Sequence, residues 1–221
     1  MIAVTYIDHM GSDLSVVNAA RVSFGKESEW NWSKELESGT GDGCTLKERD
    51  TKLIHYLAKH KHMSPFGHAF ASFHVKAPIF VARQLVKHKF LRWNEISRRY
   101  VDDEPEFYVP DQWRGRSADK KQGSDGVVEG IDSTVVESLV KCAKHDYNYL
   151  LAKGVSPEQA RMVLPQSTLT EWIWSGSLDA FTDMCNLRCK EDSQYETRLV
   201  ADYIRSEMIK LFPVSVEALI K

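Results

Sequence analysis

The stretch from Lys87 to Tyr100 reads KHKFLRWNEISRRY and concentrates five lysines and arginines and one histidine in fourteen residues. The whole chain of 221 residues carries a formal net charge of only −2, so this local charge needs an explanation. Positive clusters serve as a solvated helix face, a track for nucleic acid or a pocket for phosphorylated small molecules. Here Asn94, Glu95 and Ser97 stand among the cations and can make directed hydrogen bonds. That mixture favours a pocket for an anionic ligand.

A nucleic-acid partner is disfavoured, because the sequence has no extended basic stripe, no glycine-rich RNA-binding signature and no zinc-finger pattern. A basic-patch nucleic-acid-binding module remains the alternative from another class of protein. The phosphate-binding patterns GxxxxGK(S/T) and GxGxxG are also missing, so side chains and helix ends must hold any phosphate. Ser97 does not lie in a GxSxG elbow, which argues against a serine nucleophile.

The histidines and cysteines do not predict a metal site. His55, His60 and His62 have imperfect spacing, and no carboxylate or cysteine completes a ligand set. The four cysteines are Cys44, Cys142, Cys185 and Cys189, and no CxxC pair occurs among them. We expect reduced thiols, with Cys185 and Cys189 on one helix face, and no bound metal.

The elements that must position these residues follow from apolar periodicity and from cap residues. Strands are predicted at 2–7, at 69–78 and from 167 to 176. Helices are predicted at 13–23 after Ser12, at 46–60 with a Thr45–Glu48 capping box, at 79–89 after Pro78, at 133–153 before Gly154, from Ser156 with Pro157 and Gln159, and near 177–189 and 193–211. The basic stretch should therefore begin on the last turn of a helix and continue as a loop.

The order of these elements indicates an α+β fold, because strands are few, helices are several and no βαβ alternation occurs. The length and the 43% of hydrophobic residues predict a single domain over 1–221, with exposed polar loops near 25–44 and 111–130. Trp30 and Trp32 should pin the first loop to the body or to another subunit. The sequence has no long apolar run and no signal-peptide pattern, so we expect a cytoplasmic protein without membrane contact.

Read as a pattern, the basic stretch resembles the signature of flavin-dependent thymidylate synthases, usually RHRxxSxNExSxRY. The matching residues are His88, Asn94, Glu95, Ser97, Arg99 and Tyr100. Further blocks resemble the family in the family's order, at 18–24, 53–68, 73–84, 106–110, 160–167 and 187–196. The resemblance covers nearly the whole chain outside the two polar loops. It implies that family's fold, a central mainly antiparallel sheet packed with helices.

The sequence departs from the signature at three positions. Lys87 and Lys89 replace both arginines of RHR, and Arg92 stands where the family often has serine. Lysine keeps the positive charge but loses the planar fork that clamps a phosphate through two hydrogen bonds. Arg92 could recover part of that fork.

The resemblance implies a reductive methylation that converts dUMP to dTMP. In that reaction 5,10-methylenetetrahydrofolate gives the carbon, NADPH gives the hydride and FAD relays it. The family does not require an enzyme nucleophile, which suits a chain with no cysteine among its motif residues. A flavoprotein of the same fold that acts on another nucleotide remains the alternative among enzymes.

Roles for individual residues also come from the resemblance. Arg188 matches the arginine that stabilises the anionic uracil ring and is the catalytic candidate. The dUMP-binding candidates are Gln84, Leu85, Val86, Lys87, Glu95, Ile96, Ser97, Arg98, Arg99, Arg161 and Arg188. The FAD-binding candidates are Ser64, Lys87, His88, Lys89, Glu95, Ser177, Asp179 and Asp183, with His62 and Ser23 added. For Glu95, an ion pair with Arg92 or Arg99 is the alternative or additional role.

Members of the family are homotetramers whose active sites take residues from several subunits, and we expect the same here. Such packing would give Trp30, Trp32, Trp172 and Trp174 a role as interface anchors.

Overall fold

The computed structural model describes residues 1–32, 44–118 and 123–220. Its centre is a four-stranded antiparallel sheet with the order β1-β4-β8-β5. These strands are β1 (Ala3–Met10), β4 (Phe70–Pro78), β8 (Leu169–Ser177) and β5 (Leu91–Glu95). Two small hairpin-like pairs join β2 (Asn31–Trp32) to β3 (Cys44–Thr45) and β6 (Arg114–Arg116) to β7 (Ser124–Val127). The predicted α+β class with a central antiparallel sheet is therefore confirmed.

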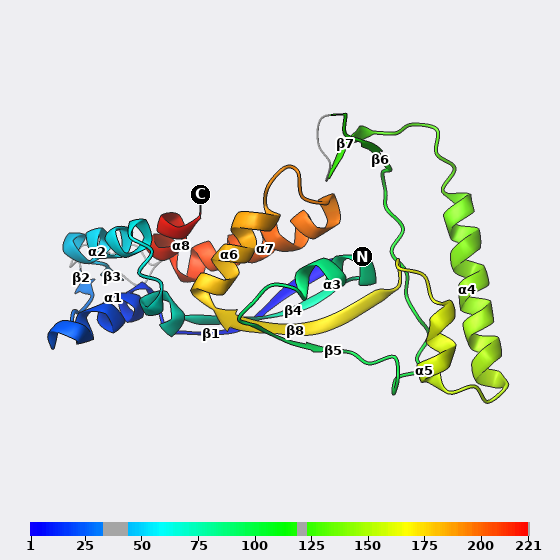
Figure 1. The fold of residues 1–221 in the computed structure, drawn as a ribbon, viewed down its shortest axis with the longest axis horizontal. Coiled ribbons are helices and arrows are strands. Elements are labelled where there is room, and N and C mark those ends of the chain that lie inside the picture. Colours follow the sequence, from blue (N-terminus) through cyan, green and yellow to red (C-terminus); the bar gives the residue numbers. More distant parts are fainter. Residues whose placement is uncertain (33–43, 119–122, 221) are drawn as a thin grey trace.

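The helices form three groups around this sheet (Figure 1). One group lies along one face of the sheet, a second gathers at one end, and α4 with α5 stands beyond the other end. Their bounds are α1 (Asp13–Arg21), α2 (Glu48–Lys59), α3 (Ile79–Leu85), α4 (Thr134–Ala152), α5 (Pro157–Ala160), α6 (Leu178–Arg188), α7 (Tyr195–Leu211) and α8 (Pro213–Leu219). Short 3-10 turns cover Val22–Phe24, Ser64–His68 and Arg161–Val163.

The core lies between the sheet and the helices on its covered face. Successive side chains of a strand point to opposite faces, and on β4 the alternate residues Phe73, Val75 and Ala77 are fully buried. On β8, the residues Trp172 and Trp174 are buried in the same way. The expectation that these two tryptophans anchor a subunit interface is wrong, because the pleat turns both rings into the core of their own chain. The other two expected anchors are Trp30 and Trp32, and of these Trp32 is 70% exposed.

The basic stretch does not continue as a loop, as predicted, but forms the edge strand β5. Trp93 in the middle of β5 stacks on Trp172 of the neighbouring strand, with ring centroids 4.2 Å apart and planes 18° from parallel. This aromatic pair across the sheet stabilises the strand. The sequence did not reveal this strand because Leu91 and Trp93, its only apolar residues, stand among charged and polar residues.

Two details at helix ends also differ from the predictions. Thr45 lies in β3, paired with Asn31, and α2 begins at Glu48 with Lys47 as its extended N-cap residue. The Thr45–Glu48 capping box is therefore wrong. The sequence also gave no sign of α8, whose backbone N–H groups at Val214 and Ser215 donate to the carboxylate of Asp13 at 2.9 and 3.0 Å.

A buried carboxylate at Asp50 connects α2 to the segment that follows α1. Its oxygens accept hydrogen bonds from Arg21 and from the Ser28 hydroxyl, and Ser28 is tied by its backbone to the Asn18 side chain. Burial acts to raise the pKa of Asp50, but these hydrogen bonds and the charges of Arg21 and Arg49 outweigh burial, so that the pKa is lowered. The network fixes the residues on both sides of Ser23.

We predict that Asp50→Asn lowers the free energy of unfolding at pH 7 by about 1–3 kcal/mol, because a charged partner of Arg21 is lost. The folded pKa of Asp50 lies below its ordinary value of 3.8, so this stabilisation is present above that pH and is lost as pH falls through the folded pKa. Urea unfolding from pH 7 to pH 3 should show a smaller loss of stability on acidification in the variant than in the parent. Equal losses in both proteins would contradict the role of this carboxylate.

Candidate functional site

The turn between α3 and β5 presents the three residues of the KHK motif. Lys87 and Lys89 are exposed, and His88 is half-buried between them. Phe90, the next residue, has a backbone φ of +64°, which a bulky side chain rarely adopts. Its carbonyl also lies only 3.0 Å from where a Cβ would sit on Gly176 of β8, so a side chain at that position would press against this turn. Unusual backbone of this kind is concentrated at functional sites.

The C-terminal end of α6 brings Arg188 to this turn. Its Nε donates a hydrogen bond to Nε2 of His88 at 3.0 Å, and its Nη2 donates to the backbone oxygen of Gln84 at 3.2 Å. The four motif positions Lys87, His88, Lys89 and Arg188 line a cavity of about 400 Å³ together with Asp183. Sequence positions that are a hundred residues apart therefore meet at one cavity.

The protonation states at this contact follow from its surroundings. Burial, and secondly the positive charge of Arg188, lower the pKa of His88 to about 4. Burial also lowers the pKa of Arg188, but an arginine keeps its charge in a protein. At neutral pH a charged guanidinium therefore donates to a neutral imidazole whose Nε2 is an acceptor.

A second cavity, of about 340 Å³, holds the other half of the predicted substrate set. It is lined by Glu95, Ile96, Ser97, Arg98 and Arg161, among others. The Glu95 carboxylate accepts hydrogen bonds from Thr170 Oγ1 at 2.6 Å and from Trp93 Nε1 at 3.0 Å.

Among the described residues, the ion pair of Arg99 is with Glu158 at 3.5 Å. The expected ion pair between Glu95 and Arg92 or Arg99 is therefore not formed. Glu95 instead accepts hydrogen bonds from two neutral donors, Thr170 and Trp93.

Other predicted residues lie outside these two cavities. Leu85 is fully buried in the core, so its side chain cannot reach a nucleotide, whereas Val86 is 48% exposed. Ser23, His62 and Ser64 are exposed on the turns after α1 and α2. Ser177 and Asp179 begin α6, and Oδ1 of Asp179 is buried with no hydrogen-bond partner. A role for these residues stays a prediction.

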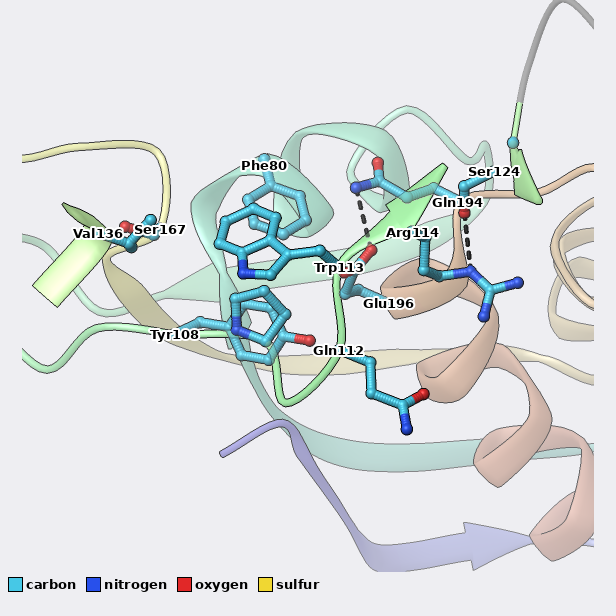
Figure 2. Close-up of a pocket in the computed structure, with 12 residues that line it drawn as sticks. Phe80, Tyr108, Gln112, Trp113, Arg114, Ser124, Val136, Ser167, Gln194 and Glu196 are labelled. Carbon is cyan, nitrogen blue, oxygen red and sulfur yellow. Dashed lines mark hydrogen bonds between the residues drawn. The ribbon is translucent and has the colours of Figure 1, made fainter. Parts of the chain in front are cut away.

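A third cavity, of about 440 Å³, lies where α3, α4 and α7 approach residues 108–114 and 123–124 (Figure 2). Phe80, Tyr108 and Trp113 form aromatic walls, and Gln194 with Glu196 forms a polar side. These polar groups are bonded to one another, since Gln194 donates to Glu196 at 3.1 Å. Burial first, and then nearby acids including its hydrogen-bond partner Glu196, raise the pKa of Tyr108 to about 12.

Gln194 lines the third cavity and also accepts a hydrogen bond from the side chain of Gln84, whose backbone oxygen accepts from Arg188 of the first cavity. Sequence reasoning did not assign Gln194 to the site. The block 187–196 contains it, but only the tertiary contact with α3 reveals the bond. Thr197 donates to Gln84 as well, at 3.3 Å.

The sequence predicts neither a bound metal nor contact with a membrane. Within 1–32, 44–118 and 123–220 there is no group of three or more His, Cys, Asp and Glu side chains that could hold a metal ion. Over the same residues, no helix is both long and apolar enough to cross a membrane. All four cysteines are free thiols.

Comparison with known proteins decides the family. A flavin-dependent thymidylate synthase from Kosmotoga olearia is 38% identical over 218 residues, which covers 96% of this chain and 87% of the relative. Residues 5–214 match the family described as thymidylate synthase complementing protein. The chain belongs to the flavin-dependent thymidylate synthase family. A further member of that family, from Thermus thermophilus, is 39% identical over 210 residues, 94% of this chain and 71% of the relative.

Solved structures support the same family at the level of the fold. A UMP/dUMP methylase, PolB from Streptomyces cacaoi, was solved with 5-Br dUMP and matches with a TM-score of 0.79 at 32% identity. The match covers 99% of this chain and 94% of that chain. The same methylase with 5-Br UMP gives a TM-score of 0.77 at 33% identity. This structural relative was thus crystallised with either nucleotide analogue.

We predict that His88 remains neutral down to about pH 4, whereas an exposed imidazole titrates near about 6.5. Side-chain NMR of labelled histidines should therefore show one resonance that does not titrate between pH 5 and 8. Arg188→Ala removes the neighbouring charge but leaves the burial, so the pKa of His88 should rise. A His88 resonance that titrates normally in the parent would contradict the contact.

Proposed function

We propose that this chain catalyses the reductive methylation of dUMP to dTMP, with 5,10-methylenetetrahydrofolate as carbon donor, NADPH as reductant and bound FAD. The observation that carries this proposal is the meeting of Arg188 with the KHK turn in a chain that matches flavin-dependent thymidylate synthases over nearly its full length. We also expect it to work in the cytoplasm, where nucleotide and folate substrates occur.

The chemical difficulty of the reaction is that C5 of uracil is a poor nucleophile. Arg188 would lie against the pyrimidine, where its fixed positive charge stabilises the negative charge that develops on the ring. A preorganised cation lowers the barrier without a covalent bond to the enzyme. Glu95, Ser97, Arg99 and Arg161 would orient the nucleotide, with the arginines as charge-assisted donors to its phosphate.

The cysteines of the chain support a mechanism without a thiolate nucleophile. Cys185 is 2% exposed, and its hydrogen bond with Cys189, followed by burial, raises its pKa well above the ordinary value. A thiol with a raised pKa is a poor nucleophile. Cys44 and Cys142 lie on β3 and α4, outside the cavities that hold the candidate residues.

The residues of the first cavity fit a flavin dinucleotide. Lys87 and Lys89 are exposed cations on a turn of fixed shape, which suits the pyrophosphate, and Asp183 and His88 line the same cavity. FAD supplies the relay of a hydride to the carbon unit during the reaction. Because both lysines lack the fork of arginine, the attraction to phosphate here is that of point charges.

We further propose a homotetramer in which each active site is shared between subunits. In one chain the candidate residues fall into two separate cavities, so a second subunit would be needed to complete a site. Large apolar side chains beside the candidate residues support this, since Phe24, Phe90, Tyr100 and Met162 are all more than 75% exposed. Exposed apolar groups next to polar sites mark interaction surfaces.

The test of the enzymatic function is an assay on the purified chain. The protein should be yellow, with flavin absorbance near about 450 nm and roughly one flavin per chain, and it should form dTMP from dUMP only when NADPH and methylenetetrahydrofolate are present. UMP should be tested beside dUMP, because the structural relative is a UMP/dUMP methylase. A colourless protein that takes up no flavin, yet binds DNA with steep salt dependence, would show that the alternative class is correct.

We predict that Arg188→Ala lowers turnover at least about 100-fold, as expected for loss of a preorganised charge at the reacting ring. FAD binding should be retained, because the lysines of the turn remain. Arg116→Ala, at an exposed arginine outside the candidate cavities, is the matched control and should turn over like the parent. Normal turnover of Arg188→Ala would remove Arg188 from the mechanism.

We predict that light scattering gives the mass of four chains. Leu139 is 64% exposed on α4, the helix that stands away from the sheet in Figure 1, and Leu139→Lys should shift the protein to smaller species because a buried charge destabilises an apolar interface. Glu48→Lys, on the exposed side of α2, should leave the mass unchanged. A monomeric parent that still turns over would contradict sharing of the site.

A further inference from the structure

Arg188 has two hydrogen-bonding edges, and its bonds to His88 and Gln84 lie along one of them. A guanidinium presents Nε–H and one Nη2–H along its side edge, and the Nη groups along its outer edge. The side edge is filled, since Nε donates to His88 Nε2 at 3.0 Å and Nη2 donates to the Gln84 carbonyl at 3.2 Å. The outer edge is free of these two partners and can meet a ligand.

We propose that His88 is a positioning residue for Arg188: its Nε2 holds the side edge of the guanidinium so that the outer edge is presented to the pyrimidine ring. This inference rests on the proposed function and adds to it a role for His88 beyond flavin contact. Without the bond, Arg188 would be anchored only at Nη2, and rotation about that single contact would move the outer edge away from the ring. Catalysis depends steeply on such placement.

The surroundings of His88 keep this acceptor available. The imidazole must be unprotonated at Nε2 to accept, and burial together with the charge of Arg188 lowers its pKa to about 4, so the bond persists at neutral pH. The charged groups that line the same cavity are Lys87, Lys89 and Asp183.

The backbone on both sides of the contact is fixed independently of any ligand. The N–H of His88 donates to the carbonyl of Leu85 at 3.1 Å, which continues the end of α3. On the other side, Arg188 is the last residue of α6, whose Phe181 packs against Trp174 of β8 with centroids 5.5 Å apart. Both partners are therefore carried on rigid elements, as a positioning contact requires.

The variants that test the proposal keep or remove the acceptor. His88→Gln places a carbonyl oxygen at about the reach of Nε2, whereas His88→Phe keeps the ring and removes the acceptor. His88→Met is a second variant without a nitrogen acceptor, in case the phenyl ring disturbs folding. His55→Phe, at an exposed histidine of α2, is the matched control for the substitution itself.

In steady-state assays with saturating FAD, His88→Phe and His88→Met should lower kcat about tenfold or more, with the KM for dUMP and the flavin content within about threefold of the parent. His88→Gln should recover kcat to within about threefold of the parent. If His88→Gln and His88→Phe lose the same activity, or if the loss of kcat parallels a loss of bound flavin, His88 acts through the flavin and the proposal is wrong.

A binding cycle separates this proposal from the proposed function, because it needs no turnover. Within the limit of about threefold set for KM, His88→Phe should weaken dUMP binding measurably in the parent but not at all in Arg188→Ala, since the effect passes through Arg188. Equal effects in both backgrounds would overturn the proposal.

The hydrogen bond can also be observed without any ligand. The Nε–H resonance of Arg188 should exchange with water at least about tenfold faster in His88→Phe than in the parent or in His88→Gln. If the exchange rates agree, the contact does not hold the guanidinium. Absence of dTMP formation in the parent would reject the proposed function alone.

Discussion

The geometry of the candidate site depends on the position of strand β8 in the sheet. One flank of β8 pairs with β5, the strand that follows the KHK turn, and its end leads directly into α6, the helix that carries Arg188. The stack of Trp93 on Trp172 and the contact of Trp174 with Phe181 fix both neighbours against the same strand. His88 and Arg188 can therefore meet only if the register of β5 on β8 is correct, and a slip by one residue would turn Trp93 out of the core.

Much of this arrangement could be predicted from local pattern. The helices after Pro78 and before Gly154, and the strands around Phe73 and Trp174, have clear periodicity and stop signals, and their positions were correct within a few residues. The sequence motifs also identified the residues that meet at the turn. Local signals of this kind predict a helix or strand correctly when that element buries one of its faces.

What could not be predicted depends on contacts between distant segments. Strand β5 carries only Leu91 and Trp93 as apolar residues, and its pairing with β8 is visible only once Trp172 is placed beside Trp93. The burial of Trp172 and Trp174 likewise follows from the helices that cover one face of the sheet, not from their own spacing. Glu95 could not be assigned its neutral partners, because Thr170 lies 75 residues away.

The sheet also separates polar groups by face. On the face opposite the core, His74 and Lys76 lie beside Glu171 at 3.0 and 3.3 Å, and all three side chains are between 24% and 40% exposed. Pairs so accessible to water contribute little to stability. The aromatic side chains on the core face of the sheet therefore contribute more to stability. The same side chains position the strand and the helix that carry the site residues.

The bond from Asp13 to the start of α8 has a consequence for how the protein is made. Its partners are 201 and 202 residues apart in the chain, so the end of the molecule built from α1, α2 and α8 cannot close until α8 has left the ribosome. During synthesis, the side of α1 that is buried in the folded protein stays uncovered until α8 has been made. Long-range closure of this kind is slow. Nascent chains would therefore depend on protection of that surface until Val214 and Ser215 emerge.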